Sequence, residues 1–148
     1  MENPEKPNIR LLPTMEVVIN EQLKNEVSKM IAKYKGHFAL LGGLDMLDTM
    51  KRYIIYDVNQ ARPVGLIGWV GPPEEADPSW WVRPESRQKG YGKRAVELLA
   101  EEMYRQGIQK IKKDILIDTE TEGEDVASRR LIRHLKKRFN SLLKRSRG

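Results

Sequence analysis

Apolar residues follow two spacings along the chain, one typical of strands and the other of helices. Runs of β-branched and aromatic residues between turn formers predict strands. These strands cover residues 9–13, 51–58, 64–70, 79–83 and 111–118. Apolar residues three or four positions apart predict amphipathic helices. The first helix has Asn20 as its N-cap and Gly36 as its stop, a second ends at Gly107, and Asp125 caps the last.

Two segments follow neither spacing clearly. Residues 15–19 fit a strand or a helix, and residues 37–50 predict a loop with at most a helical turn. Residues 59–63 supply turn chemistry between two strands, which predicts an antiparallel hairpin. The resulting order of strand, helix, hairpin, strand, helix, strand, helix is typical of an α/β fold in which helices cover the faces of a mixed sheet.

Length and composition narrow the class of protein. We expect residues 1–148 to form one domain, with residues 1–7 mobile because they are polar and contain two prolines. The chain has no cysteine, which excludes disulfides, thiolate metal sites and a cysteine nucleophile, and we predict no metal site. There is no signal-like or membrane-spanning apolar run, so we expect a soluble cytoplasmic protein without membrane contact.

Positive charge is concentrated at the C-terminal end. The chain has a formal net charge of +6, yet residues 129–147 contain nine basic residues and no acidic one, so the residues before them carry a net −3. Leu131, Leu135, Phe139 and Leu142 lie along one face of this predicted helix. The segment from residue 129 to 148 is therefore a core-packing helix with a solvated basic face, or a docking surface for nucleic acid or an acidic protein.

A basic, glycine-rich loop joins the strand that ends at Pro84 to the helix that ends at Gly107. The loop reads Arg87-Gln88-Lys89-Gly90-Tyr91-Gly92. Unpaired backbone N–H groups at a helix N-terminus, together with the helix dipole, favour phosphate groups. Gly90 and Gly92 allow a ligand to approach the backbone closely, while Arg87, Lys89 and Lys93 add positive charge. This loop therefore predicts a pyrophosphate-binding site.

The loop resembles the acetyl-CoA signature of the GCN5-related N-acetyltransferases, Arg/Gln-x-x-Gly-x-Gly/Ala, with Val82-Arg83-Pro84 matching the lead-in. The resemblance implies a mostly antiparallel sheet flanked by helices and acetyl-CoA as cofactor. It implies that the backbone of Val82 binds the pantetheine arm and that residues 88–93 surround the pyrophosphate. It also implies direct transfer of acetyl to an amine, on a small molecule or a protein.

Two departures from this family concern the C-terminal part. No tyrosine follows Tyr104, although members carry a general-acid tyrosine on the last helix; spacing puts Val126, or with an insertion Leu131 or Ile132, in its place. Ser128 and His134 are candidate substitutes. Few residues follow Phe139, so we expect the two closing strands of the family to be missing and the C-terminal part to be truncated. The wall of the acceptor site would then come from a homodimer partner, come from residues 37–50, or be missing.

Acidic residues before the fourth strand are the candidates for a general base. Glu74 and Glu75 are the catalytic candidates, with Asp77 beside them, although an exposed acidic loop explains the same residues. Trp80 and Trp81 are adjacent, so we expect them on opposite faces of the sheet. The two functional hypotheses are an acetyl-CoA-dependent N-acetyltransferase and a non-catalytic module of the same fold that binds through its basic helix.

Overall fold

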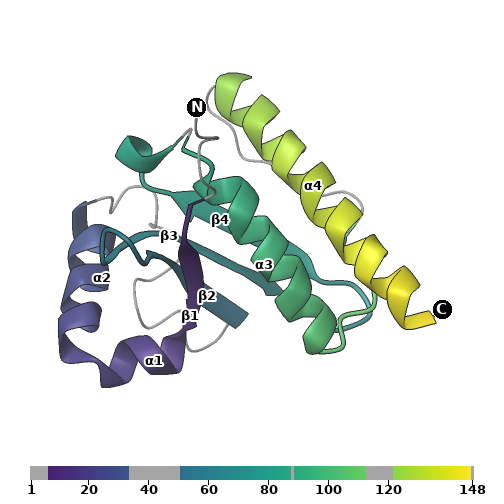
Figure 1. Ribbon diagram of the computed structural model, residues 1–148, viewed down its shortest axis with the longest axis horizontal. Helices are drawn as coiled ribbons and strands as arrows, with labels where there is room; N and C mark the ends of the chain where they lie inside the picture. Colours follow the sequence, from purple (N-terminus) through teal and green to yellow (C-terminus); the bar gives the residue numbers. More distant parts are fainter. Residues whose placement is uncertain (1–6, 34–50, 88, 113–121, 148) are drawn as a thin grey trace.

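The computed structural model of the protein describes residues 7–33, 51–87, 89–112 and 122–147 (Figure 1). Its strands are β1 (Ile9–Pro13), β2 (Lys51–Asp57), β3 (Arg62–Val70) and β4 (Asp77–Val82). Its helices are α1 (Thr14–Ile19), α2 (Glu21–Lys33), α3 (Tyr91–Arg105) and α4 (Glu122–Arg147), with a 3-10 turn η3 (Pro84–Ser86). The predicted stop at Gly36, the loop over 37–50, the mobility of residues 1–6 and most of the strand over 111–118 lie outside the described residues.

The four strands form one antiparallel sheet in the order β1-β2-β3-β4. The predicted hairpin is β2–β3, and its turn is closed by Asp57, whose Oδ1 accepts the Gln60 N–H at 2.8 Å. In the described part of the chain, an isolated parallel bridge joins Ala76, just before β4, to Ile111. The predicted class, a mostly antiparallel sheet flanked by helices, is confirmed.

Different helices cover the two faces of the sheet, since neighbouring residues of a strand point to opposite sides. Ile54 packs with Val27 of α2 in one cluster, whereas Ile55 packs with Leu99 of α3 in the other. Figure 1 shows α1 and α2 together on one side of the molecule, and α4 beside α3 on the other. Within the described part of the chain, no helix is long and apolar enough to cross a membrane.

The helix ends test the predicted caps. Asn20 caps α2 as predicted, because its Oδ1 accepts the Leu23 N–H at 3.0 Å. The ambiguous residues 15–19 belong to the short helix α1. The prediction that Asp125 caps the last helix is wrong, because α4 already begins at Glu122. Asp125 is the fourth residue of α4, so it lies inside the helix and not at the N-cap.

Helices α3 and α4 run side by side in the same direction, because residues later in α3 contact residues later in α4. Nε2 of His134 lies 3.5 Å from the Glu97 carboxylate, and Nη2 of Arg138 lies 3.3 Å from that of Glu101. Leu135 and Phe139 are fully buried between the helices and the sheet. The predicted core-packing face of the last helix is confirmed for Leu131, Leu135 and Phe139, but Leu143 packs on the core where Leu142 was predicted.

Candidate functional site

The chain reverses direction between β4 and α3 through a compact turn. The Arg83 N–H donates to the Val64 carbonyl at 2.8 Å, and Nη1 of the Arg83 side chain donates to the Pro63 carbonyl at 3.2 Å, so this segment is held to β3. The turn η3 follows, in which the N–H of Ser86 donates to the Arg83 carbonyl at 2.8 Å and Ser86 is buried. Pro84 begins this turn, where its missing N–H is not needed. The glycine-rich loop is thereby held above the end of β4.

The N-terminus of α3 has the properties of an anion site. Gly90 occupies the N-cap in the left-handed region, with φ of 87°, a conformation that other residues rarely adopt. Among the described residues no side chain caps this helix, and no acidic residue lies in its first turn, so the first N–H groups are free of described side-chain partners and suit an anionic ligand. Lys89 and Lys93 are exposed beside them. Gln88 lies outside the described residues.

Arg87 and Val82 contact each other at the base of this loop. Nε of Arg87 donates to the carbonyl oxygen of Val82 at 2.8 Å, and the Arg87 side chain is half-buried. The guanidinium therefore ties the loop to the end of β4 and places its positive charge between the strand end and the helix N-terminus. A fixed positive charge at this position favours a negatively charged group nearby.

The outer edge of β4, which leads away from the base of this loop, presents backbone groups that do not bond to β3. In an antiparallel pair, alternate residues bond to the neighbouring strand and the residues between them point away. Arg83 bonds to β3, while Ala76 bonds outward, donating to Lys110 at 2.9 Å and accepting from Lys112 at 2.8 Å. By this alternation the backbone groups of Trp80 and Val82 also point away from β3, at the outer edge of β4.

The side chain of Tyr91 is buried and does not line the loop surface. Its hydroxyl donates to Oδ2 of Asp57, a buried carboxylate at the end of β2. Burial, and then the Asp57 carboxylate, raise the pKa of Tyr91 to about 12. Tyr91 therefore anchors the first turn of α3 to the β2–β3 hairpin, and only its backbone is available to a ligand. Sequence reasoning missed this role because Asp57 looked like an ordinary strand end.

Gly92 has a packing requirement in addition to any role in binding. A Cβ at this position would lie 3.0 Å from Cδ1 of Leu131 on α4, a distance that requires one of the two to move. The absence of a side chain therefore lets α4 approach the N-terminal turn of α3 closely. The backbone of Gly92 remains part of the first turn of the helix, where its N–H has no intrahelical partner.

The acidic candidates lie at the other end of β4. Glu74 and Glu75 are exposed in the loop before the strand, and Oε2 of Glu75 pairs with Lys110 Nζ at 3.7 Å. Asp77 pairs with Lys112 at 3.8 Å. Trp80 packs on the α3 side of the sheet and Trp81 on the α2 side, as predicted.

The positions proposed for a general acid are occupied by residues with other contacts. Leu131 packs on Gly92, Ile132 is half-buried, and His134 pairs with Glu97 on α3. Tyr104 is in the last turn of α3 and packs on the core, about 20 Å from the helix N-terminus at 1.5 Å per residue. The side chains of Val126 and Ser128 lie outside the described residues.

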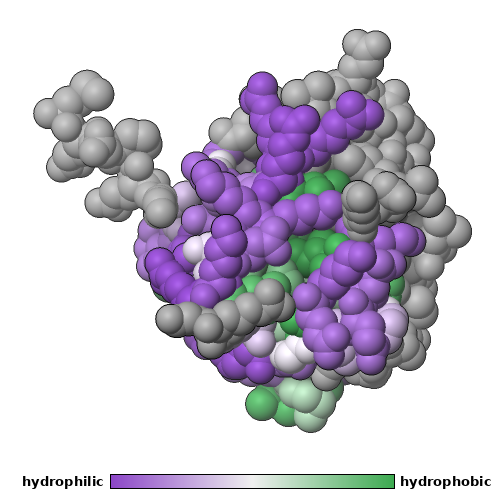
Figure 2. All heavy atoms as spheres, turned by 90° about the vertical axis from the view of Figure 1, so that its right-hand side faces the viewer, coloured by the Kyte–Doolittle hydropathy of each residue, from purple (hydrophilic) through white to green (hydrophobic). Residues whose placement is uncertain are grey.

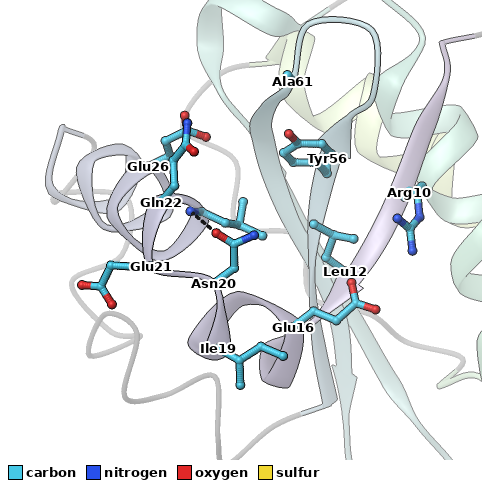
Figure 3. Close-up of a pocket in the computed structure, with 11 residues that line it drawn as sticks. Arg10, Leu12, Glu16, Ile19, Asn20, Glu21, Gln22, Glu26, Tyr56 and Ala61 are labelled. Atoms are coloured by element: carbon cyan, nitrogen blue, oxygen red, sulfur yellow. Dashed lines mark hydrogen bonds between the residues drawn. The ribbon is translucent and has the colours of Figure 1, made fainter.

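A groove of about 940 Å³ lies on the opposite part of the molecule, between α1–α2 and the first two strands (Figure 3). Glu16, Glu21 and Glu26 come from the helices, and Arg10 and Tyr56 come from β1 and β2. Sequence reasoning missed the groove because its residues come from segments far apart in the chain. β3 separates it from β4, so it is distinct from the loop at α3.

The fold and the loop together define an α/β domain in which a basic, glycine-rich loop joins strand β4 to the N-terminus of helix α3. Comparison with protein families identifies the class: residues 44–136, more than half of the chain, match the model of the acetyltransferase (GNAT) family. The chain belongs to this family. Its members are acetyltransferases that use acetyl-CoA. A comparison with curated protein sequences found no match.

Solved structures share the fold at low sequence identity. A putative GNAT-family acetyltransferase from Xanthomonas campestris pv. campestris is 15% identical, with a TM-score of 0.53 and 84% of each chain covered. Spermidine N-acetyltransferase from Vibrio cholerae, in complex with CoA and spermine, is 13% identical, with a TM-score of 0.53 and coverage of 88% and 79%. An aminoglycoside 6'-N-acetyltransferase complexed with coenzyme A is 19% identical, with a TM-score of 0.50; the match covers 68% of this chain and 57% of that structure.

Proposed function

We propose that this chain transfers the acetyl group of acetyl-CoA directly to an amine acceptor. The observation that carries the proposal is the N-terminus of α3, which has a left-handed Gly90 as its N-cap, no capping side chain among the described residues and no carboxylate in its first turn. Its donors suit a pyrophosphate. The family to which the chain belongs supplies the cofactor, and the chain's own residues are those that must bind and orient it.

The proposed cofactor contacts follow from the direction of each group. The pyrophosphate is proposed to be surrounded by residues of the loop and the first turn of α3. These are Gln88 and Lys89 together with the backbone N–H groups of Gly90, Tyr91, Gly92 and Lys93. Arg87 adds charge at the strand end, and the outward backbone of Val82 is proposed to bind the pantetheine arm. A side chain at Gly90 would be strained by the backbone conformation and would also approach Pro7 to 3.3 Å.

The same geometry orients the proposed reaction centre. A pantetheine arm bound along β4 from Val82 would run toward Asp77, which is about 17 Å away at the rise per residue of a strand. The Ile111 bridge occupies the edge at Ala76, so the reacting end lies between these limits, next to the outward N–H of Trp80. When bound, acetyl-CoA would supply the activated acetyl thioester, and the outward N–H of Trp80 would donate to its carbonyl oxygen.

The proposed general bases are Glu74 and Glu75, because their loop adjoins the end of β4 that the reacting group would reach. A carboxylate there would take the proton from an ammonium acceptor, which must be neutral to attack. Glu75 already pairs with Lys110, whereas Glu74 makes no ion pair with any described residue. Glu74 is therefore the better candidate of the two.

The direct test is release of CoA thiol from acetyl-CoA in the presence of polyamines, aminoglycosides, peptides and simple amines. We expect turnover with at least one amine and no turnover without an acceptor. Glu74→Gln should lower kcat and shift its pH dependence, while Glu75→Gln should have a smaller effect. CoA binding without turnover on any amine would contradict the enzymatic proposal and support the alternative, a non-catalytic module of the same fold.

A further inference from the structure

One surface of the molecule carries a row of positive charges that acetyl transfer does not use. Arg130, Arg133, Lys137 and Lys144 on α4 are exposed. At 3.6 residues per turn these four fall within about 60° of the helix circumference and extend over about 21 Å. We call this row the outer stripe of α4.

Packing of α4 fixes the direction in which the outer stripe points. Leu135 and Phe139, which are fully buried against α3, lie on the opposite side of the helix. By contrast, Arg138, a basic residue of α4 outside the stripe, forms an ion pair with Glu101 of α3. Figure 2 shows the side of the molecule on which α4 lies, and hydrophilic residues dominate its described surface.

Within the residues that the structure describes, the outer stripe has no neutralising partner. None of its four side chains makes an ion pair or hydrogen bond with another part of the chain that the structure describes. No acidic residue follows Arg129 in the sequence. Like charges three or four positions apart on a helix destabilise it, and Arg130, Arg133 and Lys137 have this spacing. An anionic ligand with repeated charges would remove this repulsion.

The shape and chemistry of the outer stripe favour a nucleic acid over other polyanions. Membrane-bound helices present apolar side chains beside the basic ones, but the apolar face of α4 is buried, and the exposed large hydrophobic residues include Met15 and Ile19 of α1. Protein interfaces usually have an apolar centre, which the stripe lacks. A straight row of Arg and Lys suits the regular charges of a phosphate backbone, and about 21 Å of duplex carries about twelve phosphates.

We infer that the outer stripe of α4 binds the phosphate backbone of a nucleic acid, without reading its sequence. The inference is independent of the proposed acetyl transfer. Each phosphate contact lowers log K by about 0.9 per unit of log salt concentration. Four contacts therefore predict that raising the salt from about 50 to about 200 mM weakens binding about 150-fold.

The test is fluorescence anisotropy with the full chain and labelled mixed-sequence duplexes of about 20 base pairs, as DNA and as RNA. The stripe variant carries Arg130→Gln, Arg133→Gln, Lys137→Gln and Lys144→Gln. We expect its salt slope to be smaller by about 3.6 than that of the unaltered chain. A matched control changes four basic residues on the other side of the sheet to Gln: Arg10, Lys24, Lys29 and Lys33. This control should keep the slope and the affinity.

Three outcomes would overturn the inference. The first is failure of the unaltered chain to bind either duplex at about 50 mM salt. The second is an equal loss of binding in the stripe variant and the control, which would indicate a response to net charge alone. The third is tighter binding to poly-glutamate or to anionic phospholipid vesicles than to both duplexes. Circular dichroism and CoA binding of the stripe variant, expected to be unchanged, exclude misfolding as the cause.

Discussion

Tyr91→Phe is the substitution whose effect can be worked out most fully from the structure. It removes one hydroxyl and keeps the buried ring, so it tests the contact between the first turn of α3 and Asp57. A hydrogen bond to a charged group contributes about 1.5–3 kcal/mol. Asp57 is only 4% exposed and would keep one donor, the Gln60 N–H. We therefore expect Tyr91→Phe to lower the free energy of unfolding by about 1.5–3 kcal/mol.

A double-mutant cycle, measured by unfolding in urea, separates the energy of this contact from the other effects of each single substitution. The cycle comprises the unaltered chain, Tyr91→Phe, Asp57→Ala and the double variant. Because both single changes remove the same bond, the double variant should lose about 1.5–3 kcal/mol less than the sum of the two. Single effects that add to within about 0.5 kcal/mol would refute the contact as an anchor of the helix.

Three further substitutions and conditions give separate tests. Leu135→Ala should lower the free energy of unfolding by about 2–5 kcal/mol, because the side chain is fully buried. Leu131→Ala should lower it by only about 1 kcal/mol, because Leu131 is half-exposed. Equal effects of the two substitutions in chemical denaturation would contradict the packing of α4. Tyr104→Phe should keep kcat within about twofold, since Tyr104 lies about 20 Å from the start of α3; a loss of several orders of magnitude would mean that it acts in catalysis. Burial raises the pKa values of Tyr91 and Tyr53 to about 12, above the ordinary value of 10.0. The stability they contribute is complete below pH 10 and should be lost as pH rises toward 12; Tyr91→Phe should reduce this alkaline loss in pH-dependent melting, and an unchanged loss would contradict the assignment.

Features of the fold that depend on nearby residues were predictable. The β2–β3 hairpin follows from two apolar runs separated by turn formers, and the start of α2 follows from Asn20 and the apolar spacing after it. The end of α3 was marked by Gly107, which has a φ of 84°. Asp125 was misplaced because several residues in the preceding acidic segment can begin a helix, and tertiary packing decides which one does.

Features that depend on distant residues were not predictable. Tyr91 and Asp57 are 34 positions apart, and neither has a sequence pattern that indicates a partner. Gly92 fits a ligand-binding loop and a close helix contact equally well, because both need a residue without a side chain. The pairing of Glu75 with Lys110 depends on how residues 109–112 return to the start of β4. The local part of the candidate site was thus predicted, and the contacts that support it required the structure.

The central claim is that the N-terminus of α3 binds the cofactor, and thermal unfolding with and without CoA tests it most directly. Gly90→Asp places a carboxylate at this site, whereas Gly107→Asp places one at the other end of α3, at a glycine that is also left-handed. Each change should cost about 1–2 kcal/mol in backbone strain, so only the response to CoA distinguishes them. At a CoA concentration about 100-fold above Kd, the unaltered chain and Gly107→Asp should each gain about 2.7 kcal/mol, and Gly90→Asp should gain nothing. An equal gain for Gly90→Asp, or no gain for the unaltered chain, would contradict the account.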